Sequence, residues 1–290
     1  MATPAHSRRS RSAAPATGTP PAPRTVLEAL LPAEGSAPLA LVYETANLAG
    51  LEDQPLRLAI RRACAAGDVQ QRGRGRAGNV ELTAAGRARL ARDRVGLALA
   101  LAQDAGQAPW DGRWHLVALT VPERDRAIRD GLRRELLASG AAPVATSLYV
   151  SPHDLSDVLP AAARGATATA VATHLDVRGT TEPRALAEQL WPAAPVVAAY
   201  DAVTRALADD ERGGAPVPVR QLRLADALER AMRDDPLIPV ELRAAPWAPS
   251  RARRAWAQRW QALRALPGGA HLYPGWLDEG AGGSRCVPVR

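Results

Sequence analysis

The stretch QPLRLAIRRACAAGDVQQRGRGRAGNVELTAAGRARLARDR, residues Gln54 to Arg94, carries a disproportionate share of the positive charge of this 290-residue chain. Between Arg57 and Arg94, ten arginines stand against three acids, a net charge of +7 that equals the formal net charge of the whole sequence. The chain has no lysine and no phenylalanine and is rich in alanine, which is typical of a GC-rich coding bias. Arginine in place of lysine therefore carries little information. The clustering of the arginines is informative, because codon usage cannot concentrate charge in one segment.

The first part of the stretch predicts an amphipathic helix from Pro55 to Ala66, ended by Gly67. With the spacing of an α-helix, five small or apolar side chains fall within one arc: Leu56, Ala59, Ile60, Ala63 and Cys64. Four polar side chains occupy the opposite arc: Gln54, Arg57, Arg61 and Arg62. By itself this polar face could be an ordinary solvated helix surface.

The second part predicts an arginine-rich hairpin directly behind that helix. Arg72, Arg74 and Arg76 alternate with glycines, residues 79–82 form a returning strand, and Thr83 caps a helix that runs through Arg94. A basic helix followed by a basic hairpin is typical of a winged helix-turn-helix. We expect Gln54, Arg57 and Arg61 to read base edges, Arg62 to contact phosphate, and the three hairpin arginines to clamp the backbone or the minor groove.

Strands alternate with helices in the segment that follows. Apolar runs predict strands over 115–121, 148–150 and 169–177. A helix is expected from Pro122 to Ser139, with Ile128, Leu132, Leu136 and Ser139 at helical spacing. Ser151-Pro152-His153-Asp154 is interpreted as the N-cap and first turn of another helix that continues through Val158 and Leu159. This alternation suggests a small ferredoxin-like α/β domain.

The remainder predicts helices. Their expected ranges are 182–190, 194–207, 221–233 and 251–266. Two prolines within residues 234–239 forbid a continuous helix there. In the last helix Trp256, Trp260 and Leu263 share one face, whereas Arg253 and its charged neighbours are expected mostly elsewhere.

These elements predict an α+β protein with three domains. The expected parts are a disordered tail at 1–23, a winged-helix DNA-binding domain at 24–104, a ferredoxin-like central domain at 105–180, a helical C-terminal domain at 181–277 and a flexible tail at 278–290. Two helices, Thr25–Leu31 and Leu39–Leu48, open the first domain. No apolar run approaches the roughly 20 residues that span a bilayer, and no signal-peptide core is found. A cytoplasmic protein without a membrane partner is expected.

The sequence offers no catalytic constellation. Its closely spaced glycines lie in the expected hairpin rather than before a helix, so they do not form a phosphate loop. The five histidines are scattered, and His153 beside Asp154 is better explained by the start of a helix than by a metal site shared with His174. Cys64 and Cys286 match neither a disulfide framework nor a zinc site. We expect no catalytic residue, no metal site and no cofactor.

The order of five motifs resembles the phenylacetic-acid-degradation repressors, a PaaX-type family of transcriptional regulators. The motifs are Gln54–Arg62 with Gly67, Leu82–Arg87, Trp110–Trp114, Ser151–Leu155, and Asp235–Leu242 with Trp247. The resemblance covers about residues 24–276. It implies an N-terminal winged helix, a central domain similar to the small CRISPR-associated nuclease fold, and a helical C-terminal domain.

For function, the resemblance implies a homodimeric repressor of phenylacetate catabolism that leaves double-stranded operator DNA when it binds an aryl-coenzyme A. The low aromatic content leaves another acyl-coenzyme A, or a regulator without an effector, as alternatives. A metal-dependent nuclease built on the central domain is the alternative from another class. Thr120 disfavours it, because it stands where the nuclease relatives use an aspartate.

Overall fold

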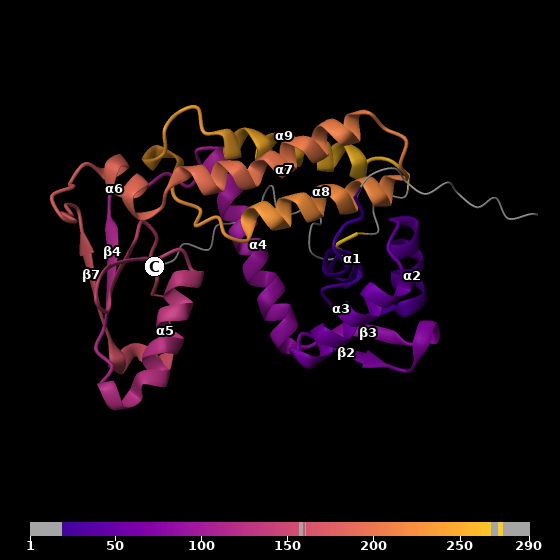
Figure 1. Ribbon diagram of the computed structural model, residues 1–290, viewed down its shortest axis with the longest axis horizontal. Helices are drawn as coiled ribbons and strands as arrows, with labels where there is room; N and C mark the ends of the chain where they lie inside the picture. The colour runs from indigo at the N-terminus through magenta and orange to yellow at the C-terminus, as the bar shows by residue number, and fades with distance from the viewer. Residues whose placement is uncertain (1–18, 157–158, 160, 268–271, 275–290) are drawn as a thin grey trace, which may run out of the picture. The chain divides into compact units, whose positions relative to one another are not determined.

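The computed structural model describes residues 19–156, 159, 161–267 and 272–274 (Figure 1). The chain divides into two compact units, with residues 1–87, 212–223 and 266–290 in the first and residues 88–211 and 224–265 in the second. The expected tail at 278–290 lies outside the described residues, as does most of the tail at 1–23. The three-domain division remains a prediction. None of the helices in the described part is both long and apolar enough to cross a membrane.

The first unit has the element order of a winged helix. Its elements are α1 (Pro23–Leu30), β1 (Ser36–Pro38), α2 (Leu39–Leu48), α3 (Asp53–Ala65), β2 (Val69–Arg72), the 3-10 turn η1 (Gly75–Ala77) and β3 (Asn79–Leu82). The three strands form an antiparallel sheet in the order β1-β3-β2. Figure 1 shows the three helices gathered beside the β2–β3 hairpin. The three helices and the hairpin were predicted from sequence within a few residues at each end, whereas β1 was missed because it is only three residues long.

The core of this unit is built from the apolar faces of its helices. Leu56 and Ile60 of α3 are buried, and α3 packs against α1 and α2. Val80 and Leu82 of β3 complete the core from the sheet. Burial of Leu56 and Ile60 fixes the rotation of α3 about its axis, because side chains on a helix repeat every 3.6 residues. The opposite, polar arc of α3 must then lie at the surface.

The second unit contains a four-stranded antiparallel sheet in the order β5-β6-β4-β7. Its strands are β4 (Trp114–Leu119), β5 (Ala142–Ala145), β6 (Leu148–Ser151) and β7 (Thr167–Ala172). A 3-10 turn η2 (Glu123–Asp125) leads into α5 (Arg126–Ala138), which lies along one face of the sheet in Figure 1. The strands lie across the sheet in the order of a ferredoxin-like domain. The mixture of helices and antiparallel sheets confirms the expected α+β class. The short edge strand β5 was not predicted.

Alternate side chains of β4 serve two separate cores. Val117 and Leu119 pack with Leu132 and Leu136 of α5. Trp114 points to the other core, where it stacks on Trp191 at 6.3 Å between ring centroids. Both sides of the central strand are therefore covered by apolar groups. Ile128 shares the helical spacing of Leu132 and Leu136, but its side chain is 56% exposed.

The helix expected after Ser151 is also wrong at the described positions. Ser151 is instead the last residue of β6, paired with His115 and fully buried. Its hydroxyl accepts a hydrogen bond from the His153 amide, and the Asp154 carboxylate accepts one from the Ser156 amide, so both side chains close local turns. Pro160 in the sequence would also interrupt a helix begun at Pro152. A 3-10 helix η3 (Ala161–Ala166) leads into β7; the expected Val158 lies outside the described residues.

Five further helices lie in the described part of the chain. They are α4 (Ala84–Asp104), α6 (Pro183–Leu190), α7 (Ala193–Glu211), α8 (Val217–Met232) and α9 (Ala248–Arg264), with a short 3-10 turn η4 (Val240–Leu242) before α9. α4 begins in the first unit and continues into the second, ten residues beyond the predicted end at Arg94. α7 and α9 run side by side within the second unit (Figure 1).

Candidate nucleic-acid interface

The polar arc of α3 lies at the surface. Gln54, Arg57, Arg61 and Arg62 are all exposed, while Leu58 is the one apolar residue among them and is 39% exposed. In a winged helix, the helix that precedes the hairpin is the one that enters the major groove. The face predicted from sequence is therefore available for contact, and its role in reading bases remains a prediction.

The wing is the tight β2–β3 hairpin at residues 69–82, and two positions at its tip require glycine. Gly73 has a left-handed φ of +78°, and a Cβ on Gly78 would lie 2.7 Å from the carbonyl oxygen of Arg72. The Gly78 carbonyl accepts a hydrogen bond of 2.8 Å from the amide of Leu39, at the start of α2. The glycines of the arginine-glycine run thus let the two strands turn, and Gly78 fastens the tip of the wing to α2.

Arg76 connects the wing to α3 and α2. Its Nη2 lies 3.2 Å from each carboxylate oxygen of Asp53, in the first turn of α3. Its guanidinium also lies over the ring of Tyr43 in α2, 5.2 Å from the centroid. These contacts position the wing against α3, a role that the sequence did not indicate because Asp53 and Arg76 are 23 residues apart.

Arg72 and Arg57 have acidic partners too. Nη2 of Arg72 lies 2.7 Å from Glu81 on the neighbouring strand, and Nη2 of Arg57 lies 3.5 Å from Asp53. Both arginine side chains are more than 60% exposed. Ion pairs at such exposure contribute little free energy, so a phosphate can replace the acid as partner at small cost.

The surroundings of Arg61, Arg62 and Arg74 differ from those of Arg57 and Arg72. In the part of the chain that the structure describes, no acid lies within ion-pair distance of their guanidinium groups. One of them lies on the wing and two lie on α3. These three side chains carry the positive charge of the surface that is not neutralised by a neighbour, and such charge is what attracts a polyanion.

The motif at Leu82–Arg87 has a structural role at the start of α4. The Thr83 hydroxyl accepts a hydrogen bond from the Gly86 amide at 3.0 Å, which confirms the predicted cap, and it donates to the Gly67 carbonyl. The Thr83 amide donates to the Asp68 carbonyl at 3.0 Å. Gly86 packs so tightly on this carbonyl that an added Cβ would lie 1.9 Å from the oxygen. The end of α3 is thereby locked to the start of α4.

In the second unit, a buried ion network surrounds Arg253, which the sequence placed mostly away from the tryptophan face of α9. The side chain of Arg253 is 3% exposed. Its Nε and Nη2 each lie 2.7 Å from an oxygen of Asp104. Its Nη1 donates to the Tyr200 hydroxyl at 2.9 Å and to Asp235 at 3.2 Å. Burial, followed by the charge of Asp235, raises the pKa of the Tyr200 phenol, which donates to that carboxylate.

The segment Asp235–Leu242 is held by further hydrogen bonds. The Asp235 carboxylate accepts from the Leu237 amide at 2.9 Å, and Leu237 adopts a left-handed φ of +51°. The Leu237 carbonyl in turn accepts from Gln103 of α4 and from Nε2 of His153, at 2.9 and 2.8 Å. This motif therefore ties together three parts of the second unit. Burial lowers the pKa of His153, although its hydrogen bond to Leu237 acts in the opposite direction.

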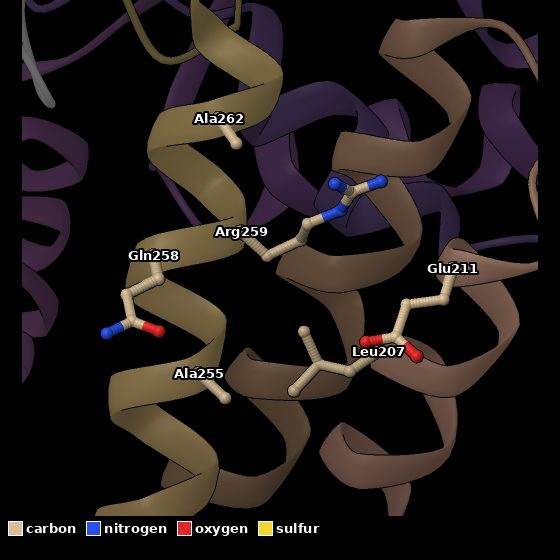
Figure 2. A pocket seen from close by; sticks show the side chains of 6 residues that line it. All are labelled: Leu207, Glu211, Ala255, Gln258, Arg259 and Ala262. Atoms are coloured by element: carbon tan, nitrogen blue, oxygen red, sulfur yellow. The ribbon is translucent and has the colours of Figure 1, made fainter.

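A pocket of about 300 Å³ lies between α7 and α9 (Figure 2). It is lined by Leu207, Glu211, Ala255, Gln258, Arg259 and Ala262. Arg259 already forms an ion pair with the buried Asp210. A lining with a single arginine, itself neutralised, is a poor match for the several phosphates of a coenzyme A.

The described residues hold no group of three or more His, Cys, Asp or Glu side chains placed to bind a metal ion. Thr120 follows the last residue of β4 and is exposed, with its amide donating to the Ala166 carbonyl at 2.9 Å. Cys64 is a free thiol, and Cys286 lies outside the described part of the chain.

The fold and the basic surface define a winged-helix protein with a ferredoxin-like domain. Residues 107–187 match the family described as the PaaX protein central Cas2-like domain. A solved structure, the "Uncharacterized protein Rv0674 from Mycobacterium tuberculosis", is 26% identical with a TM-score of 0.50, and the match covers 84% of this chain and 95% of that one. No curated protein matches. The matched segment is thus similar to the central domain of the PaaX protein.

Proposed function

We propose that this protein is a homodimeric transcriptional repressor that binds operator DNA through α3 and the wing, and that an aryl- or acyl-coenzyme A releases it. The observation that carries the proposal is the exposed basic arc of α3 beside an arginine-bearing wing, in a unit with winged-helix topology. The family match supports the regulatory part. The repressing role, the dimer and the effector rest on the resemblance of the motifs.

The seven residues that we propose to contact DNA have different roles, according to their surroundings. Gln54, Arg57 and Arg61 read base edges from the exposed arc of α3, and Arg62 contacts phosphate. Arg74 contacts the backbone from the wing. Arg72 and Arg76 contribute phosphate contacts by exchanging Glu81 and Asp53 for the DNA, while Arg76 also positions the wing.

Two substitutions separate base reading from phosphate contact. Arg61→Ala should weaken binding to the operator by roughly 1–3 kcal/mol, or about 5- to 150-fold, and relax its sequence preference. Arg74→Ala should weaken operator and scrambled DNA by the same factor and lower the dependence of binding on salt by about one phosphate. Fluorescence anisotropy on both DNAs measures this, with Arg251→Ala, an exposed arginine of α9, as the control.

The assignment is wrong if Arg61→Ala weakens operator and scrambled DNA by equal factors, as Arg74→Ala should. The effector is tested separately by thermal shift with phenylacetyl-coenzyme A and acetyl-coenzyme A. A compound that binds only the folded protein must raise its melting temperature. A repressor that is released by its effector must also lose operator affinity at the same ligand concentration.

A further inference from the structure

A second buried arginine, Arg243, lies directly after η4 in the second unit, and no role described above uses it. Its side chain is 1% exposed. A buried guanidinium is costly unless its charge is paired and its five N–H groups are hydrogen-bonded. Arg243 meets only part of this requirement.

One edge of the Arg243 guanidinium is occupied. Nη1 donates to the carbonyl of Trp191 at 2.6 Å, and the guanidinium carbon lies 5.0 Å from the ring centroid of Trp247. Glu188 approaches the same Nη1 at 3.8 Å, but its side chain is 59% exposed. The Glu188 carboxylate also accepts hydrogen bonds from the amide of Ala193 at the start of α7. It is thus held by another contact.

The other edge is not occupied. Nε and Nη2 of Arg243 are both buried, and neither has a hydrogen-bond partner among the described residues. These two nitrogens point the same way and form the two-donor edge that binds a carboxylate or phosphate with two parallel hydrogen bonds. Arg253 shows this use within the same unit, because its Nε and Nη2 hold the two oxygens of Asp104.

The negative charges near Arg243 compensate for its burial only in part. Burial lowers the pKa of its guanidinium, and the charges of Glu188 and Asp235 offset this only in part. The group nevertheless lies close to solvent along the chain, since Ala244, Ala245 and Pro246 are exposed and Trp247 is half-buried.

We propose that the Nε/Nη2 edge of Arg243 is a binding site for a small oxyanion, a carboxylate or a phosphoryl group, enclosed beside Trp191 and Trp247. The anion binds the Nε/Nη2 edge of Arg243 in the way that the Asp104 carboxylate binds the same edge of Arg253. The site belongs to the second unit and is distinct from the basic surface of α3 and the wing, so it stands or falls independently of DNA binding.

The test is the thermal stability of the full chain at constant ionic strength, with sodium chloride replaced stepwise by inorganic phosphate or by acetate. Binding to the folded state should raise the melting temperature with increasing oxyanion. Arg243→Lys keeps the charge and loses the two-donor edge, so its apparent affinity should fall at least tenfold. Arg61→Lys is the control for phosphate bound on the DNA-facing surface and should retain the wild-type response.

A second variant covers the case in which lysine disturbs the fold. Arg243→Met keeps the length of the stem without the charge, so in chloride it should be at least as stable as the wild type. It should gain nothing from phosphate or acetate. A wild-type protein that neither anion stabilises, or a response that Arg61→Lys abolishes and Arg243→Lys retains, would overturn the proposal. A marked loss of stability of Arg243→Met in chloride would also overturn it, because the charge would then already be paired inside the protein.

A titration of the arginine Nε–H signals by ¹H–¹⁵N NMR tells the two anions apart. Whichever anion occupies the site should shift the Nε–H signal that Arg243→Lys removes. If both shift it, the site recognises an oxyanion of either kind, and if one does, that anion identifies the chemistry. If neither moves this signal, the site does not exist.

Discussion

Replacement of Gly86 by alanine is expected to destabilise the winged unit, although alanine is the better helix former. The new Cβ would lie 1.9 Å from the Asp68 carbonyl oxygen, and the atom in its way belongs to the backbone, so α4 must move by about 1 Å. This movement breaks the hydrogen bond of 3.0 Å that the amide of Thr83 donates to the same oxygen.

The magnitude follows from three contributions. Overpacking costs roughly 1–3 kcal/mol, and the hydrogen bond contributes about 1 kcal/mol. Alanine in place of glycine regains about 1 kcal/mol of helix propensity. The net loss is about 1–3 kcal/mol. Gly131 of α5 is the matched control, because a Cβ there meets nothing within 4 Å and Gly131→Ala should be neutral or stabilising by up to about 1 kcal/mol.

Hydrogen exchange of the full chain measures this loss unit by unit. Six of the seven tryptophans lie in the second unit and Trp276 lies outside the described residues, so tryptophan fluorescence would miss a local effect. Gly86→Ala should lower the protection of amides in residues 23–87. Wild-type protection in Gly86→Ala, or an equal loss in Gly131→Ala, would refute the packing argument.

Two further predictions concern the second unit. Arg253→Met should lower the free energy of unfolding by roughly 3–5 kcal/mol, because two buried acids lose their counter-ion; urea denaturation followed by tryptophan fluorescence measures it, and a loss below about 1 kcal/mol would contradict the network. The pKa of His153 lies below its usual 6.5, so below pH 6.5 the unfolded state binds more protons and stability falls. His153→Gln should flatten this fall between pH 7 and pH 5 in thermal unfolding, and an unchanged slope would exclude His153 as its source.

Local patterns in the sequence predicted most of the first unit. The bounds of α2 were predicted as Leu39–Leu48, and the buried and exposed arcs of α3 follow from helical spacing alone. Residues 69–82 form the hairpin because glycine is required where the chain turns. Each of these features depends on residues within a few positions of one another.

Features that depend on distant partners could not be predicted. Arg253 is buried because Asp104, 149 residues away, supplies the matching charge. Ser151 ends a strand because it pairs with His115, and this pairing prevails over its preference for capping a helix. Asp53 and Arg76 meet only after the hairpin folds back on α3. In the candidate interface, the exposed residues were therefore predictable and the contacts that position them were not.

The central claim is sequence-specific DNA binding by α3 and the wing. Its most direct test is fluorescence anisotropy of the full chain on the intergenic DNA upstream of its own gene, against scrambled DNA of equal length, over a series of salt concentrations. The account predicts that the upstream DNA binds roughly a thousandfold or more tightly than the scramble. Equal binding to both DNAs, falling steeply with salt, would contradict it and leave the basic segment as a surface that binds phosphate alone.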